Sequence, residues 1–115
     1  MYNYGEFIRG FTEYVILSIL EKQDSYGYEI RKIILTESDD TFNLTEATLY
    51  LSLKRLTKDK MIEPFDWFNE KGVKRIYYKI TARGLRHLHD FRKDAPTILD
   101  YIKKLIIGEG NEEEN

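Results

Sequence analysis

The stretch NLTEATLYLSLKRLTKDKMIEPF, residues 43–65, decides the fold because its apolar spacing changes halfway along. Its first part has leucines spaced so that they share one face of a helix: Leu49, Leu53 and Leu56. Thr45 precedes them as the predicted N-cap of that helix. From Met61 the helical period ends and a short aromatic segment begins, in which Pro64 restricts the predicted strand to the edge of a sheet or to a strand start. The stretch therefore predicts a helix followed directly by a strand.

The side of this helix opposite the leucines carries Ala47, Leu51, Lys54 and Lys58. Thr48 and Arg55 flank that side on one edge and Tyr50 flanks it on the other. Such a surface suits DNA, with Thr48 and Leu51 reading base edges and Tyr50, Lys54 and Arg55 holding phosphates. For an isolated helix, the simpler interpretation of a solvated basic face is favoured. The elements that flank this helix shift the preference toward DNA binding.

Flanking patterns supply those elements. Apolar spacing predicts helices over residues 6–22 and 26–38, with Ser25 as the N-cap of the second and Gly27 allowing close approach of another element. Residues 38–43 are a polar loop. Residues 61–69 and 73–80 are short, aromatic and β-branched, and Glu70-Lys71-Gly72 between them is a turn, so they predict a β-hairpin. Thr81 then caps a long final helix. Three helices followed by a basic-tipped hairpin describe a winged helix-turn-helix, mostly α with a small β-hairpin.

Composition limits the class of protein. The 115 residues suit one domain, and the absence of cysteine suits the cytoplasm. The longest apolar run, residues 14–20, is too short to cross a bilayer, and the N-terminus does not resemble a secretion signal. Net charge is −2, yet residues 54–86 contain ten basic and four acidic side chains, a local excess of +6. That block is compatible with DNA binding or with a lysine-rich solvated surface.

Catalytic signatures are missing from the sequence, which predicts neither an enzyme nor a cofactor. No Ser/His/Asp set, glycine-rich phosphate loop or spaced metal-ligand cluster is present. His87 and His89 are two residues apart and therefore point to different sides of a helix, so a metal site with Asp90 is disfavoured.

The final helix has a heptad seam that is broad for a single small domain: Leu88, Phe91, Ala95, Ile98, Ile102 and Leu105. We expect this surface, together with Phe7 and Phe11 of the first helix, to be buried against a second subunit. The alternative is that the helix packs back on the first helix of its own chain. Pro96 lies within the seam and should kink the helix rather than split it.

Four motifs together resemble the PadR-like transcriptional regulators: ILSIL at 16–20, SYGYEI at 25–30, TLYLSLKRLTKDKMIE at 48–63 and KRIYYKITARG at 74–84. The resemblance covers roughly residues 6–106, and the short last helix is similar to that of the smaller subgroup. Leu51 departs from the proline frequent in the family, and the TEAT lead-in departs from a Ser-Pro-Gly type sequence. Both departures touch the groove-facing part of the helix and so concern which operator is read.

The resemblance implies a dimeric, sequence-specific regulator of double-stranded DNA, acting as a repressor by occupying a promoter. The predicted domain plan is a winged helix-turn-helix over 5–80, a dimerisation helix over 81–107 and a disordered acidic tail over 108–115. The predicted DNA-contacting residues are Tyr26, Thr45, Thr48, Tyr50, Leu51, Lys54, Arg55, Lys71, Lys74 and Arg75.

Effector binding is the least defined part of this prediction. Some PadR-like proteins bind aromatic or planar compounds at the dimer centre, so the resemblance allows a small aromatic effector, unidentified here. Trp67 is expected to pack the wing onto the helices rather than to hold that ligand, which leaves Phe91 and His87 as the aromatic candidates on the last helix. A winged helix used only for protein–protein contact is the alternative function.

Overall fold

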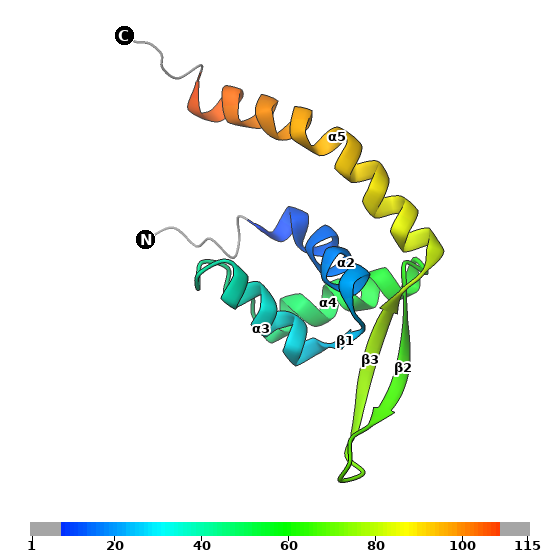
Figure 1. Ribbon diagram of the computed structural model, residues 1–115. Helices are drawn as coiled ribbons and strands as arrows, with labels where there is room; N and C mark the ends of the chain where they lie inside the picture. The colour runs from blue at the N-terminus through cyan, green and yellow to red at the C-terminus, as the bar shows by residue number, and fades with distance from the viewer. Residues whose placement is uncertain (1–7, 109–115) are drawn as a thin grey trace.

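The computed structural model describes residues 8–108 and confirms the predicted fold class (Figure 1). Three helices form a group from which a β-hairpin projects, and a long last helix arches away above them in the view of Figure 1. In chain order the elements are η1 (Arg9–Phe11), α2 (Thr12–Lys22), β1 (Ser25–Tyr26), α3 (Gly27–Glu37), α4 (Glu46–Lys58), β2 (Ile62–Phe68), β3 (Lys74–Ile80) and α5 (Ala82–Ile107). The helix expected to run continuously over 6–22 instead has a 3₁₀ turn, η1, before α2.

The core is built from the inward faces of these helices and the base of the hairpin. The predicted inward face of α4 is confirmed, because Leu49, Leu53 and Leu56 are each only 1 % exposed. They meet apolar side chains from α2, α3 and β2, among them Ile16, Leu17, Ile30 and Ile62. Burying one such side chain stabilises a fold by about 1.5–3 kcal/mol, so the leucines fix the rotation of α4 about its own axis and leave its opposite face in solvent.

Both predicted threonine caps are present. Thr45 Oγ1 accepts a hydrogen bond of 3.1 Å from the backbone N–H of Thr48 at the start of α4. Thr81 Oγ1 accepts one of 3.0 Å from Gly84 N–H at the start of α5. The Thr81 hydroxyl also lies within hydrogen-bond distance of the carbonyl oxygens of Lys60 and Met61, at 2.8 and 3.0 Å. The start of α5 is therefore fastened to the segment that joins α4 to β2.

The end of α4 explains how the chain turns so sharply into the hairpin. Lys60 takes a left-handed backbone conformation with φ +61°. Its N–H donates to Thr57 O and the next N–H, of Met61, donates to Leu56 O, which is the hydrogen-bond pattern of a Schellman motif. The helix predicted to reach the vicinity of Lys60 thus ends at Lys58.

The hairpin is confirmed, with β2 at the edge of the sheet as Pro64 predicted. Its tip is closed around Asn69, whose side-chain oxygen accepts hydrogen bonds from the N–H groups of Lys71 and Val73. Gly72 in this turn has φ +80°, a conformation that favours glycine.

A third strand, β1, was not predicted. Ser25 and Tyr26 pair antiparallel with Tyr78 and Tyr77, so the sheet order is β1-β3-β2. The prediction that Ser25 caps the following helix is wrong: Ser25 lies in β1, and its hydroxyl bonds the Glu29 carboxylate. Tyr26 occupies the cap position without a side-chain cap hydrogen bond. A two-residue strand is too short to show any period in the sequence, and only its partner β3 defines it.

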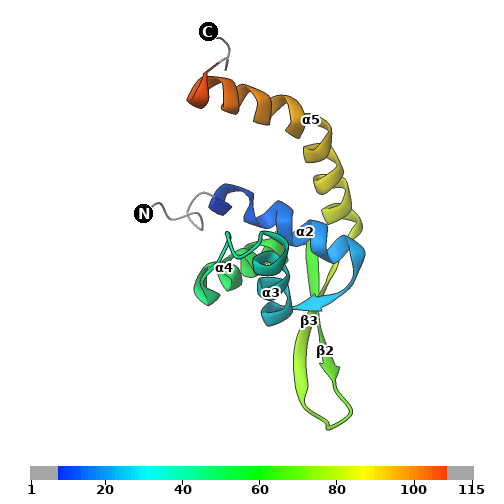
Figure 2. The ribbon, with the colours of Figure 1, turned by 60° about the vertical axis from the view of Figure 1, so that its left-hand side comes forward.

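Helix α5 continues through Pro96 without a break, as the prediction of a kink rather than a split required. Figure 2 shows that the helix bends along its length, and in both ribbon views its C-terminal half stands apart from the other described elements. None of the described helices combines the length and the apolar character needed to span a membrane. Phe7 and the predicted tail after Gly108 lie outside the described residues.

Candidate nucleic-acid interface

The outer face of α4 is open to solvent over its whole length. Ala47, Lys54 and Lys58 are exposed, and Leu51 is 56 % exposed although it is apolar. Thr48 is partly buried, and its hydroxyl accepts a hydrogen bond from Thr45 Oγ1 at 2.8 Å. The predicted helix phase is therefore confirmed, and the face combines two lysines with apolar and hydroxyl groups suited to the edges of bases.

Tyr50 stands at the edge of this face and packs against the start of α3. A Cβ atom added to Gly27 would lie 2.5 Å from the Tyr50 hydroxyl oxygen and 2.7 Å from the adjacent ring carbon. The close approach predicted at Gly27 is thus made by a tyrosine ring rather than by a backbone. Burial raises the pKa of the nearby Tyr78 hydroxyl, with a smaller contribution from Tyr50. Tyr50 of α4 therefore contacts the start of α3, while 45 % of its surface stays exposed.

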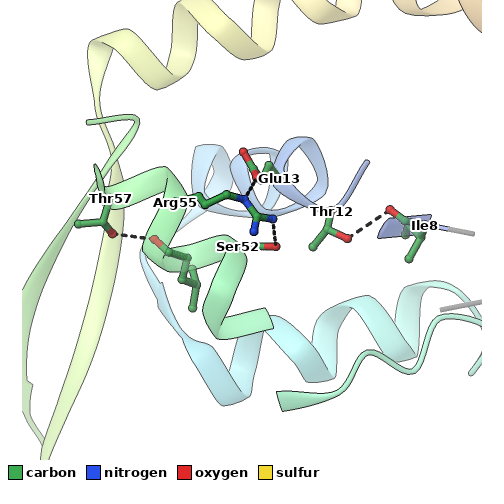
Figure 3. Close-up of polar contacts among 7 residues, drawn as sticks. Ile8, Thr12, Glu13, Ser52, Arg55 and Thr57 are labelled. Carbon is green, nitrogen blue, oxygen red and sulfur yellow. Dashed lines mark hydrogen bonds and ion pairs between the residues drawn. The ribbon is translucent and has the colours of Figure 1, made fainter. Parts of the chain in front are cut away.

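Arg55 is directed toward α2, not toward the outer face of α4 (Figure 3). Its Nε donates a 2.6 Å hydrogen bond to Glu13 Oε2, and its Nη2 lies 3.3 Å from the buried Ser52 hydroxyl. The positive charge of the Arg55 guanidinium is therefore paired with a carboxylate of the same chain. Of the two cations that sequence reasoning assigned to phosphates on α4, Lys54 is free of this contact and Arg55 links α4 to α2.

Basic side chains also line the wing, the hairpin formed by β2 and β3. Lys71 lies in the turn at the tip, and Lys74 and Arg75 begin β3. Lys74 Nζ is 4.0 Å from Asp66 Oδ2, a loose and exposed pair of little energetic weight. The Arg75 guanidinium lies instead over the ring of Tyr26, 4.6 Å from its centroid. The sheet thus brings together two predicted DNA-contacting residues that are almost fifty positions apart in sequence.

The expected role of Trp67 is wrong. Its side chain is 52 % exposed, and its ring lies 5.9 Å from Tyr77 on the neighbouring strand instead of fastening the wing to the helices. Tyr77 also contacts Phe65, at 5.9 Å, and Tyr26, at 5.2 Å. The aromatic contact between wing and helical group therefore runs through Tyr77 and Tyr26, at β1, a strand that sequence reasoning did not find.

The residues predicted to form a dimer seam divide into two groups. Leu88 is buried, and Phe91 stacks on Tyr14 of α2 with ring centroids 3.8 Å apart and also contacts Phe11. This half of the seam packs on its own chain, as the alternative interpretation held. The second half carries exposed apolar side chains along the last turns of α5: Ile98, Leu99, Ile102, Leu105 and Ile106.

Two hollows lie beside α2. A groove of about 580 Å³ runs between α2 and α3 and is lined mainly by apolar side chains such as Ile19, Ile33 and Phe42. A smaller hollow of about 230 Å³ lies beside the Tyr14–Phe91 stack. His87 also stacks on Tyr14, with ring centroids 5.3 Å apart. These two aromatic partners of Tyr14 come from α5, more than seventy residues later in the chain.

Glu21 adds polar contacts between α2 and α5, the two helices that the aromatic stack also joins. Its carboxylate is 2.9 Å from Arg92 Nη2 and 3.5 Å from His89 Nε2, so it bridges two turns of α5. Hydrogen bonding to Arg92 lowers the pKa of Glu21 below its ordinary value of 4.5, and His89 lowers it further to a smaller extent.

Replacing Glu21 with glutamine is expected to lower the melting temperature slightly at pH 7 and not at strongly acidic pH. A folded-state pKa below the unfolded value means that the carboxylate stabilises the fold above the ordinary pKa and that this stabilisation is lost as pH falls through the depressed pKa. The effect is small because the group is exposed. Thermal unfolding of wild type and Glu21→Gln across pH 3 to 7 measures it, with Glu37→Gln as the charge-matched control; a constant difference across that range would contradict the assignment.

Three short helices, an exposed third helix and a basic wing define a winged helix-turn-helix protein. Sequence comparison matches residues 16–90 to a family described as "Transcriptional regulator PadR-like family". The chain belongs to this PadR-like family of transcriptional regulators, which confirms the resemblance found in the sequence.

Similar proteins cover almost the entire chain. Uncharacterized protein X of Lysinibacillus sphaericus is 34% identical over 104 residues, which span 90% of this chain and 95% of that protein. The transcriptional regulator YqjI of Escherichia coli is 29% identical over 102 residues, and those span 89% of this chain but only 47% of YqjI.

Solved structures agree with this relationship. A transcriptional regulator from Clostridium thermocellum has a TM-score of 0.78 and 34% identity, covering 88% of this chain and 95% of its own. A PadR-like regulator from Bacillus cereus has a TM-score of 0.75 and 30% identity, covering 90% and 99%. The PadR of Bacillus subtilis, solved in complex with operator DNA, has a TM-score of 0.62 and 26% identity, covering 69% of this chain and 45% of that one.

Proposed function

We propose that this chain is a sequence-specific double-stranded DNA-binding regulator that acts in the cytoplasm as a homodimeric repressor by occupying a promoter. The observation that carries the proposal is the division of α4 into a buried leucine face and an exposed face with Lys54 and Lys58. The operator complex of the Bacillus subtilis PadR supports it from a relative with the same fold.

The dimensions of α4 suit the major groove. Its 13 residues make a cylinder about 20 Å long, and a helix fits a groove about 12 Å wide. Ala47, Thr48 and Leu51 on its N-terminal half would face base edges, while Lys54 and Lys58 would approach phosphates. The wing, with Lys71, Lys74 and Arg75, would lie along the adjacent backbone or minor groove. Thr45 is engaged as the helix cap and would contribute chiefly by holding the first turn in place.

The C-terminal half of α5 supports the proposed assembly into a dimer. Its apolar side chains from Ile98 to Ile106 are 38 to 82 % exposed, which is costly for a chain that remains alone in water. A second copy supplies the matching surface, because a two-fold interface uses the same patch on both subunits. Two recognition helices would then reach half-sites about one DNA turn apart.

Replacing Lys54 with alanine should weaken binding to all duplexes by a similar factor and reduce the slope of log K against log salt by about one. The lysine is exposed on the outer face of α4, so folding should be unchanged. The measurement is a fluorescence-anisotropy titration of duplex DNA at several salt concentrations, using a site selected from random sequences.

Arg55→Ala serves as the comparison in the same titration. Because Arg55 is paired with Glu13, its loss should lower the melting temperature, which Lys54→Ala should not. Wild-type protein that binds no duplex at low salt, or binds without a salt slope, would contradict the proposed function and favour a winged helix used for protein–protein contact. Relief of repression in a promoter–reporter assay on adding small aromatic compounds would test the effector.

A further inference from the structure

The basic residues that the sequence predicted to contact DNA are held in different ways. Arg55 is neutralised by Glu13 at 2.6 Å. Within residues 8–108, the ion pairs of the wing are Lys74 with Asp66 and Lys79 with Glu63, and Arg75 takes part in neither. Arg75 is supported by the Tyr26 ring alone among these contacts, at 4.6 Å from the centroid.

Sheet register explains why these two residues meet. Tyr26 is the Cα partner of Tyr77, and Arg75 precedes Tyr77 by two residues on the same strand. Residues two apart on a strand point to the same face of the sheet, so Arg75 and Tyr77 share the face on which the Tyr26 ring lies. The ring of Tyr77 is 5.2 Å from that of Tyr26, so the Tyr26 ring contacts both Tyr77 and Arg75 of β3.

The chemistry of the contact differs from that of an ion pair. An aromatic face attracts a guanidinium through the quadrupole of the ring and removes one long side chain's freedom, yet it leaves the positive charge uncompensated. The N–H donors of arginine lie in the plane of the group and point outward from its edge, so a guanidinium resting on a ring can still donate to a phosphate. A carboxylate in the same place would occupy those donors.

We propose that Tyr26 is a positioning residue for DNA binding: its ring holds the Arg75 guanidinium, uncompensated, at the junction between the start of α3 and the wing, oriented for a backbone phosphate. This inference rests on the proposed function. The junction lies beside the exposed face of α4, since Tyr50 of α4 packs on Gly27, the residue after Tyr26. The proposed phosphate would lie between the groove that α4 reads and the groove that the wing follows. Arg75 would bind it, and neither α4 nor the wing positions Arg75 without Tyr26.

A double-mutant cycle with Tyr26→Leu and Arg75→Ala tests the proposal in the full-length protein. Arg75→Ala should weaken duplex binding roughly threefold to tenfold and lower the salt slope by about one. Tyr26→Leu should weaken binding roughly twofold to fivefold, the range of an exposed cation–π contact, and lower the slope in the same direction. The double variant should bind no more weakly than Arg75→Ala, and Tyr26→Phe, which keeps the ring, should retain wild-type affinity and slope.

Phe65→Leu is the matched control, because Phe65 contacts the same Tyr77 ring, whereas the aromatic ring under the Arg75 guanidinium is that of Tyr26. It should reduce stability without changing the salt slope. The positioning role is overturned if Tyr26→Leu lowers the melting temperature like Phe65→Leu and leaves the salt slope intact, or if the losses from Tyr26→Leu and Arg75→Ala add. Failure of the wild-type protein to bind any duplex would instead overturn the proposed function and the positioning role with it.

Discussion

Replacing Gly84 with alanine is expected to lower the free energy of unfolding by about 3 kcal/mol or more, at the upper end of what overpacking costs. A Cβ atom at this position would overlap the backbone carbonyl oxygen of Met61 and come within 2.8 Å of Ile80 Cγ1. Neither a carbonyl group nor an isoleucine packed against the core can move aside cheaply. The clash also opposes the small gain in helix propensity that alanine would bring.

Thermal and denaturant unfolding measure this effect, which corresponds to a decrease of roughly 10–25 °C in melting temperature for a domain of this size. Gly10→Ala is the matched control, because a Cβ atom there has no atom within 4 Å among the described residues. We expect that variant to be neutral or slightly stabilised. Equal stability of the two variants would show that α5 does not approach the α4–β2 corner as closely as described.

The second large effect is expected from Ile102→Glu on the exposed half of α5. In the proposed dimer this side chain is buried, and an unpaired carboxylate there would cost several kcal/mol. The protein should become monomeric at micromolar concentration. Operator affinity should fall by a factor of about 10² to 10⁴, because two linked half-sites bind far more tightly than one.

Sedimentation velocity gives the oligomeric state, and anisotropy titration with a two-half-site duplex gives the affinity. Thr97→Glu adds the same charge to the same half of α5 at an exposed position outside the apolar stripe, and should change neither. The proposed interface would be contradicted by an Ile102→Glu protein that remains dimeric. A monomeric variant with undiminished operator affinity would separate assembly from DNA recognition.

Local signals in the sequence were sufficient for most of the fold. The leucine period of α4, the caps Thr45 and Thr81, and the turn at Gly72 each depend on residues within a few positions of one another. Such features are governed by helix geometry and turn chemistry, which operate over short distances. They defined the winged helix-turn-helix and which face of α4 is exposed.

Contacts between residues far apart in the chain could not be predicted from local sequence signals. The pairing of β1 with β3, the Glu13–Arg55 ion pair and the seating of Arg75 on Tyr26 each join residues 42 or more positions apart. Trp67 shows the consequence: its aromatic character indicated packing against the helices, but the register pairs it with Arg75 near the tip of the wing, where it remains 52 % exposed.

By itself the sequence determined that this is a winged helix-turn-helix chain with a basic block and an apolar last helix, because those properties are encoded in period, caps and composition. Only the tertiary structure decided which basic side chains are paired with a carboxylate and which are not. It also decided where the last helix stops packing on its own chain. The physical reason is that charge pairing and burial depend on distances between side chains from different elements, and those distances exist only once α2, α4, α5 and the wing have packed together.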